Sequence, residues 1–539
     1  MWQVLYLSHS FFVTERVFFM KKTFTRVISV LLVLTLTLSV AFTGAYAKET
    51  TGAEALASLE KNIPIIEIPG FGDQPLYNGL LTETEDDDTD VWSFPVETLI
   101  LNILRHFPNI VSSLALGNFE KMDESMTEIM SVIFGGIACD ENGVPVPGSG
   151  YKNKEVVVKK DEYGRRNSYY FDYDWRLDMH TISSQLDELV NEVLEVTGAE
   201  EVGLVSFSMG GAVMMTYLYE HYYIVSAEER SKIHSAIFIS GAMNGVECCG
   251  DPFSGNINFD SKSLLRLLSD TVSANEGTAW LSDMIVALYA LKIFEPLVSY
   301  TNNTLVPQLG TMADEAVVST IGTVPAFYGL MSSERYYQTE EFLFGTPERQ
   351  EKYAGIIEKS RYYHENVQAN ADKVIEAFIA DGKNFAVISE YGFPMLPVTS
   401  DNDRMSDGMI GTYSTSFGAT CAEIDGTFGE NYVQKVQCAC GKNHISPDNQ
   451  IDASTCKYTD VTWFAKNLKH VDDDKYFADI VDLITYSDEQ ITVNTYSDFP
   501  QYLINVDDTG LVPMTAENAG EVVSFEDRAD IKKFFENLF

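Results

Sequence analysis

A serine on a predicted strand-to-helix turn is the feature that most constrains the fold of this 539-residue chain. Residues 202–205 read Val-Gly-Leu-Val, an apolar run typical of a buried strand, and residues 212–218 form an apolar run typical of a helix. Ser208 lies between them. Such a turn lifts the hydroxyl clear of a sheet and turns the next backbone N–H groups toward a reacting oxygen. The segment therefore predicts a nucleophilic serine.

The residues around this serine must be small, because the strand and the helix approach each other closely at such a turn. Gly210 meets this requirement two positions after Ser208. Ser206 stands where the usual G-x-S-x-G pattern has its first glycine, so the chain departs from the pattern by one small residue.

Strand-like and helix-like segments alternate on both sides of the turn. Residues 182–197 carry apolar side chains on one helical face and end at Thr197-Gly198, a helix stop signal. Such alternation implies an α/β fold, with a mainly parallel sheet flanked by helices on both faces. The predicted strands are residues 63–68, 168–172, 202–205, 235–240 and 385–389.

Residues 251–380 interrupt this alternation with long helical patterns rich in Leu, Tyr and Phe. We expect them to form a large helical cap insertion over the carboxyl edge of the sheet. Helices are also expected within residues 94–135 and 527–539. The acidic run at 83–90 is expected to be a solvated turn, with a calcium loop as the alternative.

A serine nucleophile needs a carboxylate that orients its base, and three candidates lie in one loop. In α/β hydrolases this acid follows the serine along the chain and comes after a late strand. Asp407, in Ser-Asp-Gly-Met-Ile, fits this position best. Asp401 and Asp403 share the loop and are the alternatives.

The base is expected after the acid, and two histidines follow that loop. His470 comes just beyond the apolar and aromatic segment 463–468, from which a loop can reach back to the serine. His444 lies among clustered cysteines and is the alternative. The predicted catalytic residues are therefore Ser208, Asp407 and His470.

The oxygen that becomes negative during acyl transfer needs backbone N–H donors. One donor is expected from Met209, directly after the serine. The other is expected from Phe71, in the Pro-Gly-Phe-Gly turn at residues 69–72 that follows the first strand. Gly70 and Gly72 let the backbone approach a substrate closely and are candidate pocket residues. The alternative is that residues 69–72 form an ordinary strand-to-helix turn with no role in binding the oxyanion.

Short islands of this sequence resemble the lecithin:cholesterol acyltransferase-like branch of the α/β hydrolases. That branch has a P-G-x-x-G loop, a Y-D-W-R segment and a G-H-S-M-G-G elbow, and its acid and base loops resemble two later segments here. The resemblance implies an α/β-hydrolase fold and a lipase or acyltransferase activity, but the expected cap and the cysteine segment do not match. The corresponding residues are 69–72, 173–176, 206–211, 406–408 and 468–470, within a span of roughly 62–475.

Asp174-Trp175-Arg176 has two interpretations. Arg176 could pair with Asp174 or another carboxylate and brace the edge of the sheet, with Trp175 in the core. Alternatively, Trp175 contacts the substrate, which makes it a candidate pocket residue.

The N-terminal residues predict export. A basic region at 20–26 precedes an apolar stretch, and Ala45-Tyr46-Ala47 has the pattern of a signal-peptide cleavage site. We expect residues 1–19 to be an upstream extension, 20–47 a signal peptide cleaved after Ala47, and 48–539 a secreted α/β-hydrolase domain. A membrane anchor is the alternative, although the apolar stretch is short for a span of about 20 residues.

Seven cysteines follow that site, and four of them cluster in a predicted insertion at 421–456. In an exported protein these four favour a local disulfide. A zinc site is the alternative. It is not the first choice because one residue separates Cys438 from Cys440, where zinc sites usually have two. The cluster consists of Cys421, Cys438, Cys440 and Cys456.

The formal net charge of −42 makes nucleic acid an unsuitable partner, because such a surface repels phosphate backbones. We expect no cofactor and no metal at the predicted site, and only transient contact with a membrane or lipid surface. The expected activity is hydrolysis of a carboxylic ester, with a lipid ester as the expected substrate. An amidase or acyltransferase with the same catalytic residues, or a non-catalytic binding protein on a hydrolase scaffold, are the alternatives. Oligomeric state stays open.

Overall fold

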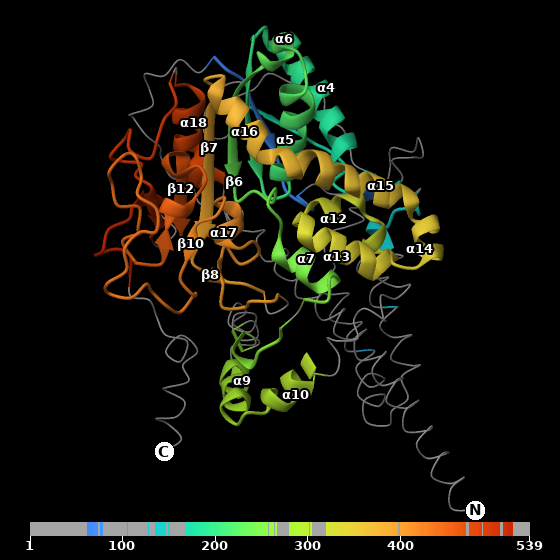
Figure 1. Ribbon diagram of the computed structural model, residues 1–539, viewed down its shortest axis with the longest axis vertical. Helices are drawn as coiled ribbons and strands as arrows, with labels where there is room; N and C mark the ends of the chain where they lie inside the picture. The colour runs from blue at the N-terminus through green and yellow to red at the C-terminus, as the bar shows by residue number, and fades with distance from the viewer. Residues whose placement is uncertain are drawn as a thin grey trace, which may run out of the picture.

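A mostly parallel eight-stranded sheet with flanking helices organises the chain in a computed structural model (Figure 1). The chain therefore has an α/β fold, as the alternation of segments predicts. The structure describes Arg105, Glu128 and residues 62–73, 76–78, 135–146, 149–150, 168–256, 258–263, 265–266, 280–300, 302–303, 318, 320–396, 399–470, 474–487, 489–506 and 510–520. The signal-peptide segment, the acidic run at 83–90 and the predicted C-terminal helix lie outside these residues, as does almost all of 94–135.

The strands of the sheet follow the order β14-β13-β12-β7-β6-β5-β1-β4, and every neighbouring pair is parallel except β13 with β14. All residues of β5 and β7 are buried, as expected for a sheet covered on both faces. The strands are β1 (Ile65–Ile68), β4 (Ser168–Tyr170), β5 (Val202–Phe207), β6 (Ile233–Ile239), β7 (Asn384–Tyr391), β12 (Thr462–Lys466), β13 (Tyr502–Asn505) and β14 (Leu511–Pro513).

Helices pack against both faces of this sheet. Helices α4 (Met179–Thr197) and α5 (Gly210–Leu218) contact each other, and α5 also contacts β1 and β5. Helices α16 (Ala371–Ala380) and α18 (Ala478–Thr485) both contact β7, and Figure 1 shows α16 in front of that strand and α18 behind it.

Helix α4 illustrates how the local sequence fixes an element. The carboxylate of Asp178 accepts a hydrogen bond from the Thr181 N–H at 3.0 Å and caps the first turn. Gly198 ends the helix with a φ of +69°, where its N–H donates to the Leu194 carbonyl. The predicted apolar face, including Ile182 and Leu186, is buried in the core.

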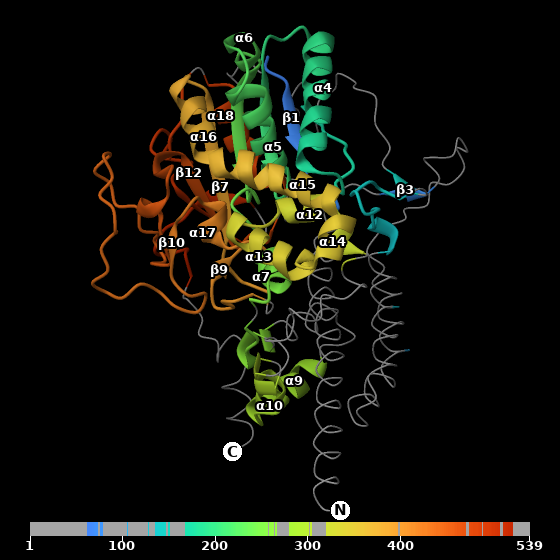
Figure 2. The same ribbon diagram turned by 45° about the vertical axis from the view of Figure 1, so that its right-hand side comes forward.

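The segment expected to form the cap is helical throughout its described part. Figures 1 and 2 show two of its helices, α9 (Trp280–Ala290) and α10 (Phe294–Tyr300), set apart from the sheet on the side where the strands end. The last one, α16, instead contacts β7, and its Phe378 meets Tyr222 of the π-helical turn Tyr219–Tyr223 with ring centroids 4.9 Å apart. The other helices here are α7 (Glu247–Phe253), α12 (Pro325–Gly329), α13 (Ser333–Phe344), α14 (Pro347–Lys352) and α15 (Ala354–Tyr362).

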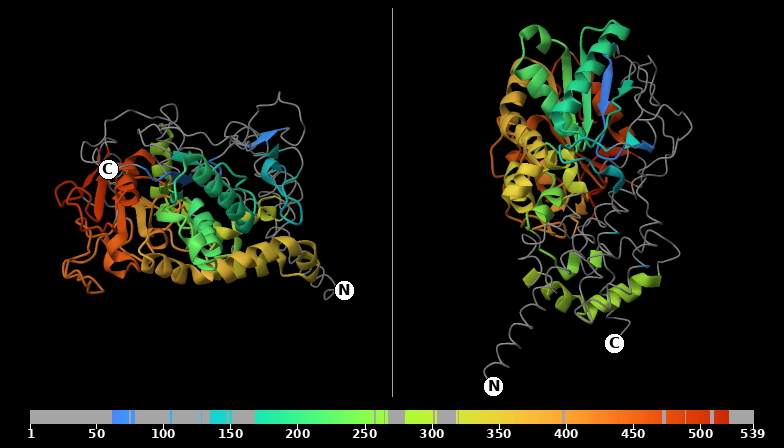
Figure 3. Two further views of the ribbon diagram at one scale, coloured as in Figure 1. Left: turned by 90° about the horizontal axis from the view of Figure 1, so that it is seen from above. Right: turned by 90° about the vertical axis from the view of Figure 1, so that its right-hand side faces the viewer.

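The last third of the chain is rich in loops. Short elements between β7 and β12 are β8 (Phe393–Pro394), β9 (Met405–Ser406), α17 (Thr412–Thr415), β10 (Thr420–Cys421), β11 (Ile451–Asp452) and the 3₁₀ turns η9 (Ala453–Thr455) and η10 (Thr459–Val461). Figure 3 shows this part at one end of the sheet, away from the N-terminal strands. No helix in the described residues is long and apolar enough to cross a membrane.

Candidate active site

Ser208 stands on the predicted turn, between the end of β5 and the start of α5. Its φ of +51° is in the left-handed region, which a non-glycine residue rarely adopts. Strain of this kind is kept where the surrounding structure imposes it, and such positions cluster at functional sites. The turn therefore presents the hydroxyl at the carboxyl edge of the parallel sheet, where α/β proteins bind ligands.

The flanking small residues are required by close contacts. A Cβ on Gly210 would lie 2.1 Å from the Ile68 carbonyl oxygen at the end of β1. Ser206, at the departure from the usual pattern, is fully buried, and its hydroxyl reaches the Ile237 carbonyl at 3.4 Å. The serine is accommodated within the sheet, so the departure leaves the turn intact.

His470 lies directly against Ser208, with its Nε2 2.7 Å from the serine Oγ. It follows β12, the strand whose aromatic segment marks it in the sequence. Its other ring nitrogen, Nδ1, lies 2.7 Å from Oδ2 of Asp407. The three predicted catalytic side chains are thus connected in one line, although 262 residues separate Ser208 from His470.

Asp407 is held rigidly beneath the imidazole. Its side chain is fully buried, and its Oδ1 accepts hydrogen bonds from the N–H groups of Met409 at 2.9 Å and Ile410 at 2.7 Å. The carboxylate can only accept, so the facing Nδ1 of His470 carries the proton. Nε2 is then unprotonated and can accept the hydroxyl proton of Ser208.

The charges around His470 favour its protonated form. Burial alone lowers the pKa of His470, but attraction to Asp407, the hydrogen bond from Nδ1, and the carboxylates of Glu390 and Asp73 together raise it above its ordinary value. A base with a raised pKa accepts a proton more readily. The site is therefore arranged to remove a proton from Ser208.

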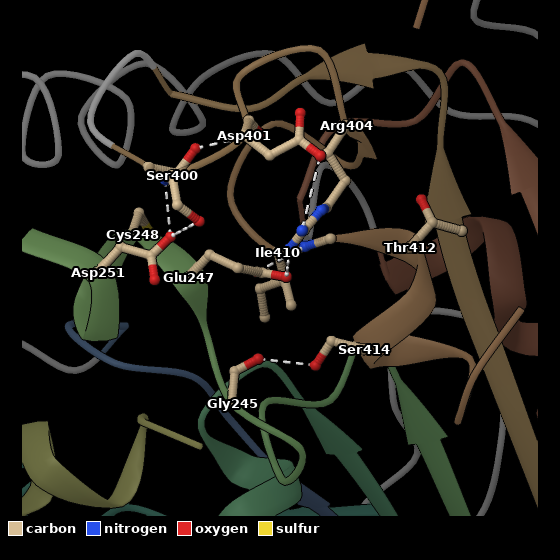
Figure 4. A network of polar contacts seen from close by, with 12 residues as sticks. Gly245, Glu247, Cys248, Asp251, Ser400, Asp401, Arg404, Ile410, Thr412 and Ser414 are labelled. Carbon is tan, nitrogen blue, oxygen red and sulfur yellow. Dashed lines mark hydrogen bonds and ion pairs between the residues drawn. The ribbon is translucent and has the colours of Figure 1, made fainter. Parts of the chain in front are cut away.

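A polar network ties the Asp407 loop to the segment after β6 (Figure 4). Glu247 accepts a hydrogen bond from the Gly411 N–H at 3.0 Å and pairs with Arg404 at 3.3 Å. Burial raises the pKa of Glu247, while these two partners lower it. Asp251 accepts from both the N–H and the hydroxyl of Ser400 at 2.8 Å. The loop carrying the acid is fixed at both ends.

The alternative acids and the alternative base lie elsewhere. Asp401 pairs with Arg404, 3.6 Å away, and Asp403 pairs with Lys262 at 2.9 Å. His444 is buried with its ring against Gln501 and a cysteine thiol. Of the candidates weighed from the sequence, the geometry joins only Asp407 and His470 to the serine.

The turn after β1, at residues 69–72, lies beside Ser208. A Cβ on Gly70 would be 3.0 Å from the Cβ of Ser208, so any larger residue there would crowd the nucleophile. Gly72 has a φ of +79°, which favours glycine. Met209 is fully buried directly after the serine. Phe71 follows Gly70 in this turn and is half-buried.

Trp175 is fully buried and packs on Phe71, with ring centroids 4.3 Å apart. Beside it, buried Arg176 makes two side-chain hydrogen bonds to Asp174, at 2.8 and 2.6 Å. The pairing of Arg176 with Asp174 that the sequence analysis considered is therefore present. Through its contact with Phe71, Trp175 packs against the turn at residues 69–72.

Three supporting contacts at the site are not indicated by the sequence patterns. The buried Tyr173 donates its hydroxyl to the Pro69 carbonyl at 2.7 Å. Asp73 turns its carboxylate back to accept the Gly70 N–H at 2.7 Å. Glu390, buried at the end of β7, brings a carboxylate oxygen within 4.8 Å of ligand atoms of Asp407 and His470. The sequence signal that could have identified Glu390 is its position as a charged residue near the carboxyl end of a strand.

The expected local disulfide is absent, since all seven cysteines are free thiols. Cys421 and Cys456 lie in a small core cluster with β10 and β11. The thiols of Cys438 and Cys440 instead face polar side chains, Asp460 and His444. The clustering in sequence therefore does not bring the four sulfurs together as cross-linked pairs.

No family model matches this chain, and no curated protein matches its sequence. The geometry of the site and the sequence patterns are therefore the basis for any functional conclusion.

Proposed function

We propose that this protein is a serine hydrolase with an α/β-hydrolase fold that cleaves carboxylic esters, and that its substrates are lipid esters. The observation that carries the proposal is the continuous hydrogen-bonded line from Ser208 through His470 to Asp407, with 2.7 Å at both steps. The left-handed conformation of Ser208 and the order of the three residues along the chain agree with that fold.

The geometry supports the following reaction. Ser208 Oγ attacks the acyl carbon while His470 Nε2 accepts its proton. Asp407 keeps the imidazole oriented and stabilises its positive charge. The backbone N–H groups of Met209 and Phe71 donate to the negative oxygen of the tetrahedral intermediate. His470 then protonates the leaving alcohol, and water attacks the acyl-enzyme by the reverse steps.

The lipid part of the proposal rests on apolar surface as well as on the resemblance. Leu291 and Ile293, on either side of Lys292 between α9 and α10, are 66% and 55% exposed. Helix α9 is largely apolar, and both helices lie on the side where the strands end (Figure 2). Exposed apolar patches mark interaction surfaces. We propose that this helix pair touches the lipid aggregate that presents the ester.

A panel of p-nitrophenyl and glycerol esters of increasing chain length tests the proposal. We expect hydrolysis by the wild-type chain and loss of on the order of 10⁴-fold or more in kcat for Ser208→Ala. Ser206→Ala is the matched control, because it changes a buried serine two residues earlier, in β5, without touching the nucleophile. A folded wild-type protein that cleaves no ester, or a Ser208→Ala variant with full activity, would contradict the proposal.

Acyl transfer uses the same acyl-enzyme and is separated from hydrolysis by its acceptor. Adding a long-chain alcohol or a sterol to the reaction should leave free fatty acid as the main product. Formation of a new ester instead would assign the chain to the acyltransferases, with the same three catalytic residues.

A further inference from the structure

A second cluster of reactive side chains lies between Asp407 and His470 in the sequence but forms a group separate from the catalytic residues used above. Cys438, Cys440, His444 and Asp460 each offer one ligand atom, and these atoms all lie within 4.8 Å of one another. Asp460 comes from η10, just before β12, whereas the other three come from the loop between β10 and β11. Two parts of the chain thus converge on one point.

The hydrogen bonds of His444 show which ring nitrogen faces the cluster. Gln501 donates its amide N–H groups to the carbonyls of Thr459 at 2.9 Å and Thr462 at 3.2 Å, so its Oε1 is an acceptor. That Oε1 lies 2.6 Å from His444 Nδ1, which therefore carries the proton. Nε2 is therefore unprotonated, and its lone pair faces Cys440 Sγ 3.0 Å away.

An outer hydrogen bond of this kind is the usual support of a metal-binding histidine, because it fixes the tautomer and the orientation of the ring. The backbone of His444 is fixed as well. Its N–H donates to Gln434 Oε1 at 2.8 Å, and its carbonyl accepts from the Ala453 N–H at 2.9 Å and from the Tyr502 hydroxyl. The imidazole is buried and already oriented toward the two sulfurs.

Backbone donors also point at the two sulfurs. The Cys440 N–H donates to Cys438 Sγ, and the Lys442 N–H donates to Cys440 Sγ, each at 3.4 Å. Hydrogen bonds to sulfur favour the thiolate, which is the form that binds metals. Gly441, with a φ of +72°, makes the turn that directs the second donor inward. Cys438 Sγ lies 3.4 Å from Asp460 Oδ1, the fourth ligand.

We propose that Cys438, Cys440, His444 and Asp460 bind a structural zinc ion. Two thiolates, one imidazole and one carboxylate suit this borderline-soft cation, and four protein ligands complete its tetrahedral coordination without an open position for substrate. The ion joins the loop between β10 and β11 to the start of β12, the strand that leads to His470. It therefore acts on stability and not on the chemical step.

The zinc content of the full-length protein, purified under reducing conditions with zinc supplied, tests this proposal. We expect about one tightly held zinc ion per chain, the number one tetrahedral site binds. Cys440→Ser should lose most of it. Cys421→Ser is the matched control, because that thiol lies in the same segment but outside the cluster, and it should keep the ion. A chelator should lower the melting temperature of wild type and control but leave Cys440→Ser unchanged.

Cobalt replacement keeps the test independent of how well the variant folds. Wild-type protein reloaded with Co²⁺ alone should show a thiolate-to-metal charge-transfer band, which the Cys421→Ser control retains. Three outcomes would overturn the proposal. They are a folded wild type without bound zinc or a cobalt band, zinc bound equally by Cys440→Ser, or thiol titration of the denatured protein showing Cys438 and Cys440 joined in a disulfide. None of these depends on ester hydrolysis.

Discussion

Tyr173 donates its buried hydroxyl to the Pro69 carbonyl at 2.7 Å and so joins two segments 104 residues apart. Pro69 begins the turn whose Phe71 N–H is proposed to stabilise the oxyanion. Burial raises the pKa of Tyr173 well above its ordinary value, so the phenol stays protonated and remains a donor. The Tyr-Asp-Trp-Arg segment is therefore expected to position the turn at residues 69–72.

Replacing Tyr173 by Phe should affect both stability and catalysis. It leaves the Pro69 carbonyl without this donor, which costs about 1–3 kcal/mol of the free energy of unfolding. The loosened turn should lower kcat by about tenfold while KM changes little, because the donor acts mainly in the transition state. Urea denaturation and ester kinetics measure the two effects. Tyr496→Phe, at an exposed tyrosine, should change neither, and unchanged kcat in Tyr173→Phe would remove the positioning role.

Asp407→Asn tests the orientation of the base. An amide in place of the carboxylate can donate to Nδ1, which puts the imidazole proton on Nε2 and stops it accepting from Ser208. The corresponding change in a serine protease triad lowers kcat by about 10⁴-fold, and we expect a loss of similar order here. Asp401→Asn is the control, because that carboxylate pairs with Arg404 and not with His470. Equal losses in both variants would contradict the assignment.

The pH dependence of kcat/KM should follow His470. Its imidazole must be neutral to accept the proton, so activity falls as the pH drops through its pKa. Because that pKa is raised from its ordinary 6.5, the acidic limb of wild type should lie above pH 6.5. In Asp407→Asn the attraction is lost while burial still lowers the pKa. The acidic limb of the pH profile of this variant's residual activity should then move down by about 1–3 pH units. A limb that stays in place would show that another group titrates.

Gly210 tests the fit of the turn against β1. Its added Cβ in Gly210→Ala would lie 2.1 Å from the Ile68 carbonyl oxygen and 2.8 Å from that of Pro69, and these backbone atoms have little room to move. We expect a loss of about 3 kcal/mol or more in the free energy of unfolding, at the upper end of overpacking costs. Gly429→Ala is the control, since nothing lies within 4 Å of its added Cβ. Equal stability of the two variants would show that the turn tolerates a methyl group.

The sequence predicted the strands on either side of the serine because each is a short, continuous apolar run. Residues 385–389 lie within β7, the predicted strand 235–240 overlaps β6 but runs one residue past its end at Ile239, and residues 202–205 begin β5. Strand β12 was predicted only as an apolar segment, because its Lys466 interrupts the run. That lysine is buried against Asp448 at 2.8 Å, a partner the pattern does not contain.

The candidate site was predictable in its reacting residues but not in its supports. Chain order and the apolar segments singled out Ser208, Asp407 and His470. The roles of Tyr173 and Asp73 depend on contacts across the sheet edge, which no local pattern records. The cysteine segment was wrongly expected to form a disulfide, because spacing alone does not show which side chain each thiol faces.

Labelling by a fluorophosphonate probe tests the central claim most directly, since the probe reacts only with a serine that a neighbouring base activates. Mass spectrometry of the digested full-length protein should find the adduct on Ser208. The adduct should disappear in Ser208→Ala, be strongly reduced in His470→Ala and persist in His444→Ala. A well-folded wild-type protein that the probe does not label, or labels at another serine, would contradict the account.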